Sequence, residues 1–280
     1  MRCIITITYI EQFCRQLQNE ERSPATIEKY SRDLRQFAKW LGQRAVSKEN
    51  VTAWKQHLLT QRRCAATVNG KLSALDRFLR MMGWEDASVK HLRAQRRVFR
   101  DACRTLGRDE YLRLVQTAAA RGQERLALVL ETLCATGIRV SELHAITAEA
   151  VARRQVTISL KGKVRTILLP GKLCKKLQRY TCQQKIASGE IFLTRSGKPL
   201  SRKQIWAEMK TLARHAGVAA EKVYPHNLRH LFARVFYKNN KDIVTLADLL
   251  GHSAIETTRL YLITSASEHE RTLEQLRLVT

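Results

Sequence analysis

Apolar residues recur every three or four positions along the N-terminal part of the chain, which is the spacing of one face of an α-helix. The clearest helix begins at Ser23 and Pro24, a capping residue followed by proline at the first helical position, and Gly42 lies near its end. Two further helices are expected, from Ser47 to Gln61 and from Ala65 to Met82. This part of the chain is therefore predicted to form a compact bundle of about four or five helices.

The polar sides of two of these helices carry basic and hydrogen-bonding side chains. Opposite the apolar faces lie Lys29, Arg32, Arg35 and Lys39 in one helix and Thr67, Asn69 and Lys71 in the other. Such a helix side is often only solvated, and it can equally contact a polyanion. A further basic group falls in the stretch from Lys90 to Arg104, which has few apolar anchors, and includes Arg96, Arg97 and Arg100. This stretch is predicted to be a linker that follows a phosphate backbone or, alternatively, a solvated helix.

The pattern changes after this basic stretch. Helices are expected from Asp109 to Ala120 and from Glu124 to Ala135. Two β-rich runs follow, Val156 to Leu160 and Arg165 to Leu169, and they flank a Lys-Gly-Lys turn. This arrangement predicts a β-hairpin. Helical patterns return after it and continue to the end of the chain.

The predicted fold class is mainly α in two domains. A helical bundle is expected over residues 1–92, a basic linker over 93–104, and a mostly helical domain with a small β-hairpin over 105–280. Fifty Lys and Arg against 25 Asp and Glu leave a formal net charge of +25. This excess is larger than solubility requires, and nucleic acid is the polyanion that fits it best.

Several other classes are disfavoured by the sequence. A short apolar run near the N-terminus is interrupted by Glu11 without a cleavage site, so no signal peptide is expected, and no stretch is long enough for a membrane span. The seven cysteines are odd in number, scattered, and without a C-x-x-C pair. A cytoplasmic protein with free thiols, no metal and no cofactor is expected.

Four short blocks carry residue types that can bind or cleave a phosphodiester. Arg139 follows a helix break, and Lys161 lies on the predicted turn. The run His-Asn-Leu-Arg-His occupies residues 226–230, and His252 precedes Tyr261 by nine positions. Each block alone has an ordinary explanation: a surface arginine, a turn lysine, surface histidines or a core tyrosine. The histidine pair also has the spacing of a zinc helix, but the glutamate that would serve as general base is missing.

Together these blocks resemble the tyrosine recombinase family of Xer proteins, phage integrases and conjugative-transposon integrases. The family pattern is Arg, Lys, His-x-x-Arg, Gly-His and Tyr, and the matching residues here are Arg139, Lys161, His226, Arg229, His252 and Tyr261. The hairpin differs, since it reads Leu-Lys-Gly-Lys where many members have Gly-Lys-Gly, so Lys163 stays an alternative to Lys161. The resemblance covers nearly the whole chain and is to the simpler members without an arm-binding domain.

The resemblance implies a mechanism. Tyr261 would attack the phosphodiester and form a 3′-phosphotyrosine, while two arginines neutralise the phosphate. His226 would be the base, His252 a hydrogen-bond donor to a phosphate oxygen, and Lys161 the acid for the 5′ oxygen. No ATP or metal is required. Glu142, one turn beyond Arg139, is expected either to orient the arginines or to be exposed.

The resemblance also implies partners. A helical core-binding (SAM-like) domain and a catalytic domain would close around double-stranded recombination sites as a clamp. The chain would act as a homo-tetramer on DNA, be a monomer in solution, and work with accessory DNA-bending proteins. Two rival functions remain open: a type IB topoisomerase, and a DNA-binding regulator with an inactive catalytic domain. A relaxation assay and a covalent-adduct assay distinguish them.

Overall fold

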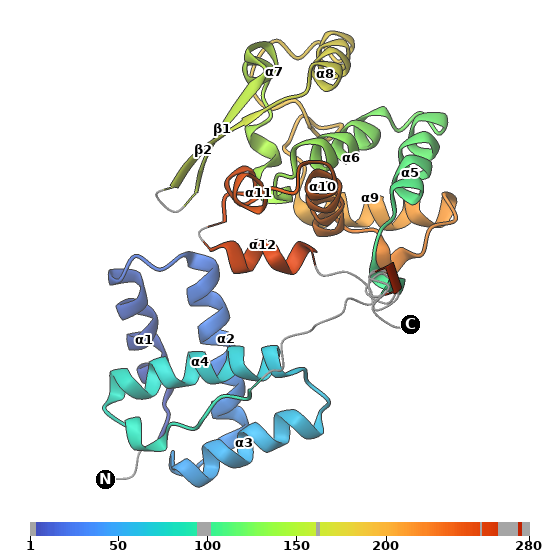
Figure 1. The fold of residues 1–280 in the computed structure, drawn as a ribbon. Helices are drawn as coiled ribbons and strands as arrows, with labels where there is room; N and C mark the ends of the chain where they lie inside the picture. Colours follow the sequence, from blue (N-terminus) through green and yellow to red (C-terminus); the bar gives the residue numbers. More distant parts are fainter. Residues whose placement is uncertain (1–3, 94–101, 161–162, 253, 263–273, 276–280) are drawn as a thin grey trace. The chain divides into compact units, whose positions relative to one another are not determined.

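The computed structural model describes residues 4–93, 102–160, 163–252, 254–262 and 274–275. The chain divides into two compact units, residues 1–96 and 97–280 (Figure 1). Helices make up most of the described residues, and the strands found there form a single two-stranded antiparallel sheet. The predicted class, mainly α with a small β-hairpin, is confirmed. None of the described helices has both the length and the apolar character that a membrane crossing requires.

The first unit is a helical bundle. Its elements are α1 (Ile7–Asn19), α2 (Pro24–Leu41), α3 (Lys48–Thr60), α4 (Ala65–Met82) and the 3-10 turn η1 (Glu85–Ala87). The Ser23 hydroxyl accepts a hydrogen bond from the Thr26 amide at 3.3 Å, so the predicted cap of α2 is confirmed. Aromatic rings from all four α-helices of this unit contribute to its core, where Phe13 lies edge-on to Phe78 with ring centroids 5.7 Å apart.

The second unit is also mostly helical. Its elements are η2 (Ala102–Arg104), α5 (Arg108–Ala120), α6 (Glu124–Thr136), η3 (Val140–Ala145), α7 (Ala148–Arg153), β1 (Gln155–Leu160), β2 (Lys163–Leu168), α8 (Gly171–Gln183), α9 (Arg202–His215), η4 (Ala220–Lys222), α10 (Pro225–Asn240), α11 (Ile243–Leu250) and α12 (Ile255–Leu262). Helix α6 is buried along most of its length and forms the centre of the core. A smaller cluster of buried residues joins α10, α11 and α12.

The two strands pair in the register expected for a short hairpin. Gln155 pairs with Leu168 and Leu160 pairs with Lys163, so β2 begins two residues before the predicted start. The difference arises because the ladder continues to the turn, where sequence patterning alone could not distinguish strand from loop. Every second residue faces the core, as the buried Val156 and Ile167 show.

The turn from α6 into η3 depends on a glycine. Gly137 has φ +64, a conformation that side chains with a Cβ rarely adopt. A Cβ added there would also lie 2.8 Å from Cε1 of Phe232, a residue of α10. Glycine therefore lets α10 pack closely against the end of α6, two residues before Arg139.

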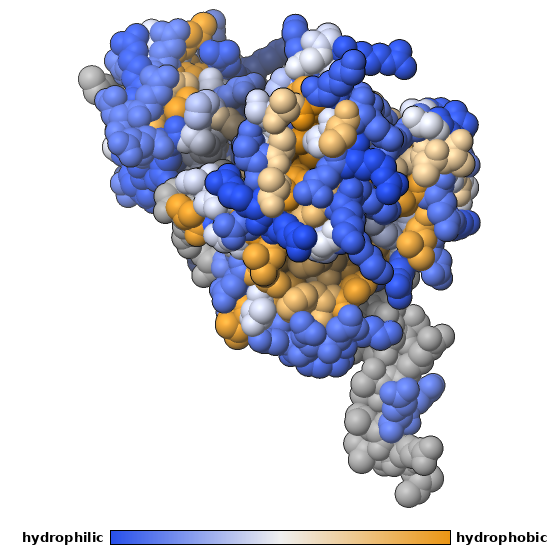
Figure 2. Space-filling view, turned by 90° about the horizontal axis from the view of Figure 1, so that it is seen from above, coloured by the Kyte–Doolittle hydropathy of each residue, from blue (hydrophilic) through white to orange (hydrophobic). Residues whose placement is uncertain are grey.

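Hydrophilic side chains dominate the face drawn in Figure 2, and apolar atoms gather there in separate small patches. The formal net charge of the whole chain is +25. Such an excess of positive charge attracts a polyanion.

Candidate active site

Five of the six residues expected from the sequence motifs lie in described parts of the second unit. Arg139 opens η3 directly after the Gly137 turn. Helix α10 carries His226 and Arg229 one turn apart. His252 follows the end of α11, and Tyr261 lies in the last turn of α12.

These residues converge around the tyrosine ring. Tyr261 is 6% exposed, and its ring centroid lies 5.4 Å from that of His226 and 5.2 Å from that of His252. The guanidinium carbon of Arg229 is 5.9 Å from the same centroid. Residues from α10, the α11–α12 connection and α12 therefore form one site within a single chain.

Arg229 is the most buried of the charged groups, with 1% exposure. Its Nη1 donates to the Gly137 carbonyl at 2.6 Å, and its Nη2 donates to the Leu250 carbonyl at 2.6 Å and to His252 Nε2 at 3.0 Å. None of the ion pairs found among the described residues involves Arg229. Burial, and then Arg139, lower its pKa to about 10, so it stays charged at neutral pH. A buried cation without a carboxylate partner is suited to bind an anion.

Glu142 is buried and orients Arg139. The carboxylate is 3% exposed. It accepts hydrogen bonds from the Arg139 backbone at 2.7 Å and from Arg139 Nη1 at 2.9 Å. Of the two readings the sequence left open, orientation of the arginines is therefore correct and an exposed carboxylate is wrong.

Arg165 is a member of this cluster that sequence reasoning missed. It lies on β2, where its Nη2 donates to Glu142 at 2.6 Å and its Nη1 donates to the Leu250 carbonyl. Burial is the main cause that lowers its pKa. One signal was available in the sequence, since Arg165 alternates in phase with the buried Ile167 and so lies on the inward side of the strand.

His252 is held from both ring nitrogens. Its Nδ1 lies 2.8 Å from the Thr258 hydroxyl, and its Nε2 faces Arg229. Burial first, and then the neighbouring arginines with Arg229 the strongest, together lower the pKa of His252 to about 4. The ring is therefore neutral at physiological pH.

His230 is an unexpected neighbour of Tyr261. Its ring centroid lies 4.2 Å from that of Tyr261 and 4.6 Å from that of His226. The histidine pair on α10 thus packs against a phenol ring. The sequence indicated the pair but could not show what it contacts.

Several other expected residues lie outside the described part of the chain. These are Lys161 and the linker residues Arg96, Arg97 and Arg100. The alternative general acid, Lys163, is the first residue of β2. The tail from residue 267 to 278, expected to dock on a neighbouring copy or on its own domain, is also almost entirely outside it.

The expected DNA contacts of the first unit differ in their surroundings. Most are exposed, namely Lys29, Arg32, Arg35, Lys39 and Thr67. The side chain of Asn69, by contrast, donates to the Leu92 carbonyl at 2.9 Å and accepts from its amide at 2.8 Å. Lys71 donates to the buried Asp33 at 2.9 Å, and Lys29 lies 3.2 Å from the same carboxylate. Asn69 and Lys71 therefore already have partners within the unit.

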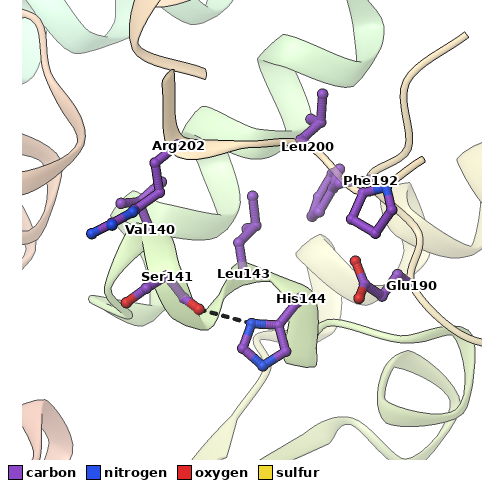
Figure 3. A pocket seen from close by; sticks show the side chains of 9 residues that line it. Val140, Ser141, Leu143, His144, Glu190, Phe192, Leu200 and Arg202 are labelled. Carbon is purple, nitrogen blue, oxygen red and sulfur yellow. Dashed lines mark hydrogen bonds between the residues drawn. The ribbon is translucent and has the colours of Figure 1, made fainter. Parts of the chain in front are cut away.

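A cavity of about 230 Å³ lies on another side of η3 (Figure 3). It is lined by Val140, Ser141, Leu143, His144, Glu190, Phe192, Pro199, Leu200 and Arg202. His144 Nδ1 donates to the Ser141 carbonyl at 2.7 Å, the bond that is dashed in the figure. None of the motif residues lines this cavity, so it is separate from the arginine cluster.

Comparisons with known proteins agree with this arrangement. The phage integrase family profile matches residues 104–268, and the profile of the phage integrase N-terminal SAM-like domain matches residues 10–86. The tyrosine recombinase XerC of Roseiflexus castenholzii is 31% identical, over 90% of this chain and 87% of its own. XerD of Rhizobium meliloti is 28% identical, over 92% and 91%.

The fold is likewise shared with solved structures. A lambda integrase dimer bound to a COC' core site has a TM-score of 0.73 at 18% identity, and the match covers 93% of this chain and 78% of that one. The integrase profile spans more than half of the 280 residues, and close to the full length of the Xer relatives is matched. The chain therefore belongs to the phage integrase family and is a tyrosine recombinase, an enzyme that cleaves and rejoins DNA strands.

Proposed function

We propose that the chain exchanges strands between specific DNA sites and that Tyr261 is the nucleophile. The observation that supports this assignment most is the position of the Tyr261 ring, 5.9 Å from the guanidinium of Arg229 and 5.4 Å from the His226 ring. A phosphodiester repels nucleophiles through its own negative charge, and its alkoxide leaving group is poor. A phenol that lies beside a buried cation and an imidazole can overcome the repulsion, because the cation offsets the negative charge of the phosphate.

The two arginines would bind the scissile phosphate from different directions. Arg229 is fixed by carbonyl oxygens at the ends of α6 and α11, while Glu142 holds Arg139. Rigid guanidinium groups bind phosphate oxygens with little reorganisation as charge develops. The arrangement therefore favours charge stabilisation that is built in before DNA arrives.

The proton transfers complete the step. As the bond between the Tyr261 oxygen and phosphorus forms, His226 takes the phenol proton. As the bond to the 5′ oxygen breaks, Lys161 gives a proton to that oxygen, with Lys163 as the alternative. The product is a 3′-phosphotyrosine and a free 5′ hydroxyl, and attack by a partner strand reverses the step. The phosphodiester energy is kept throughout, so the balance needs neither ATP nor a metal ion.

The organisation on DNA follows from the same proposal. A core-binding domain over residues 1–92 would present the exposed basic side of α2 to the duplex, and the linker 93–104 would connect it to a catalytic domain over 105–280. One solved structure of similar fold is a lambda integrase tetramer bound to a Holliday junction, and another is XerH bound to its difH substrate. By analogy the chain would be a monomer that assembles as a tetramer on two sites, with DNA-bending proteins as helpers, in the cytoplasm.

A nicked suicide substrate tests the proposal directly. Cleavage close to a nick lets the short 5′-hydroxyl strand diffuse away and traps the covalent adduct. The wild-type chain should form an adduct that survives denaturation, and Tyr261→Phe should form none while still binding the DNA. An adduct in Tyr261→Phe would exclude this nucleophile. A plasmid with two target sites separates recombination from the relaxation that a topoisomerase would give.

A further inference from the structure

A buried threonine links the tyrosine helix to the histidine of the site. Thr258 is 0% exposed and lies one turn before Tyr261 on α12. Its hydroxyl is 2.8 Å from His252 Nδ1. The neighbouring Thr257 is exposed, so only one of the two adjacent threonines faces the site. A hydroxyl buried at that depth is expected to have a specific partner.

The contacts of His252 determine where its proton lies. Arginine has only hydrogen-bond donors, so the Arg229 Nη2 at 3.0 Å requires a lone pair on His252 Nε2. The ring is neutral, because burial and the surrounding arginines Arg229, Arg139 and Arg165 lower its pKa to about 4. A neutral imidazole with a lone pair on Nε2 carries its single proton on Nδ1. That proton points at the Thr258 hydroxyl, which must accept it.

We propose that Thr258 is a positioning residue for strand cleavage: it accepts the hydrogen bond from His252 Nδ1–H and holds the Nε2 lone pair of that ring toward Arg229. This inference rests on the proposed function of Tyr261. Consecutive hydrogen bonds then connect Thr258 on the tyrosine helix to the His252 ring, and that ring to the buried guanidinium of Arg229. His252 in the DNA-free chain acts as an acceptor that orients Arg229.

The same geometry changes the role expected for His252. The sequence motif suggests that this ring donates to a phosphate oxygen. In the DNA-free site its Nε2 has no proton to donate, because Arg229 occupies that direction. The ring can therefore donate from Nε2 only after it gains a second proton or after its proton moves from Nδ1 to Nε2, and the hydrogen bond to Thr258 disfavours the second route.

Nitrogen-15 NMR of histidine-labelled full-length protein without DNA tests the tautomer. His252 should show a protonated Nδ1 and an unprotonated Nε2, with the Nδ1–H signal protected from exchange with water. The resonance is assigned by its loss in His252→Gln. In Thr258→Val the Nδ1–H signal should exchange away, and in Thr258→Ser it should persist. A protonated Nε2 in the wild type, or an unchanged Nδ1–H signal in Thr258→Val, would overturn the proposal.

Single-turnover cleavage of the suicide substrate tests the consequence. Valine matches threonine in shape but lacks the hydroxyl, so Thr258→Val should slow cleavage about tenfold or more, with DNA affinity within about threefold of the wild type. Thr258→Ser should recover most of the rate. The matched control is Thr257→Val, which changes the exposed neighbour on the same helix and should keep the wild-type rate. Equal rates for the two valine variants would contradict a positioning role.

The adduct assay and the cleavage rate of Thr258→Val distinguish an error about Tyr261 from an error about Thr258. If the wild-type chain gave no adduct, the proposed function would be wrong whatever the tautomer. Suppose instead that the wild-type chain gave an adduct, that Tyr261→Phe abolished it, and that Thr258→Val cleaved normally. The assignment of Tyr261 as nucleophile would then be supported, and the positioning role of Thr258 would be wrong. A Thr258→Val variant with a lowered melting temperature and a rate that Thr258→Ser did not restore would identify a folding defect and would also count against positioning.

Discussion

The guanidinium groups of Arg165 and Arg229 donate hydrogen bonds to the same carbonyl oxygen, that of Leu250. One arginine comes from the hairpin and the other from α10, and the carbonyl belongs to the last residue of α11. Arg165 also donates to Glu142, which in turn holds Arg139. The hairpin is thereby attached to the elements that carry Arg139 and Arg229, the two arginines that we propose bind the phosphate.

Loss of Arg165 should therefore impair cleavage more than DNA binding. A hydrogen bond to a charged group contributes about 1.5–3 kcal/mol, which corresponds to roughly a 10- to 100-fold lower cleavage rate for Arg165→Ala. Arg165→Lys keeps the charge but cannot donate to Glu142 and Leu250 together, so it should recover only part of the rate. Arg179→Ala removes an equal charge from an exposed position on α8 and is the control. Full activity of Arg165→Lys would show that charge alone matters.

Gly122 and Gly137 have similar φ angles. Replacing each with alanine therefore distinguishes the cost of backbone strain from the cost of side-chain overlap. Gly122 has φ +67 and an added Cβ would meet nothing within 4 Å, whereas a Cβ at Gly137 would collide with the Phe232 ring. Gly122→Ala should lower the free energy of unfolding by about 1 kcal/mol, which is the cost of the left-handed conformation. Gly137→Ala should lower it by about 3 kcal/mol, since overpacking adds to that cost. Denaturant titration measures both, and equal losses would contradict the packing argument.

The lowered pKa of His252 predicts a pH dependence of stability. The unfolded chain protonates this histidine near pH 6.5, whereas the folded chain resists protonation down to about pH 4. Its contribution to the free energy of unfolding is complete above pH 6.5 and is lost as the pH falls through this window. His252→Gln should therefore show a shallower decline between pH 6.5 and 4, measured by denaturant titration. The exposed His215→Gln is the control, and parallel curves for wild type and His252→Gln would refute the assignment.

A substrate with a better leaving group identifies the general acid. A 5′-bridging phosphorothiolate releases a thiolate, which needs no proton from the enzyme. Lys161→Ala should cleave an ordinary substrate poorly, and it should cleave the thiolate substrate at nearly the wild-type rate. Lys163→Ala should cleave both normally. The reverse pattern would transfer the role to Lys163.

The site residues that could be predicted from the sequence are those that lie next to a local structural signal, such as a helix end or a helical spacing. Arg139 follows a glycine at a helix end, and His252 follows Gly251 in the same way. His226 and Arg229 share a helix face because of their spacing. Helix positions were predicted closely for the same reason, since periodicity and caps are local properties.

The supporting residues could not be predicted because their partners are distant in the chain. Arg165 meets Leu250 across 85 positions, and Arg229 meets Gly137 across 92. Asp33 shows the same limit in the first unit, since nothing near it in the sequence indicates that a carboxylate at 7% exposure will bind Lys71. Pairing over such distances depends on how helices pack, which periodicity alone does not define.

The tyrosine and the cations around it come from one polypeptide. Tyr261 packs against Ala233, Leu246 and Leu250 of its own chain in the small cluster that joins α10, α11 and α12. Under the proposed assignment, one subunit therefore supplies both its own nucleophile and the histidine and arginine beside it. In an assembly of mixed subunits, a copy that lacks the phenol could not be repaired by a neighbour that lacks the arginines, so the number of strands cut would follow the number of intact copies.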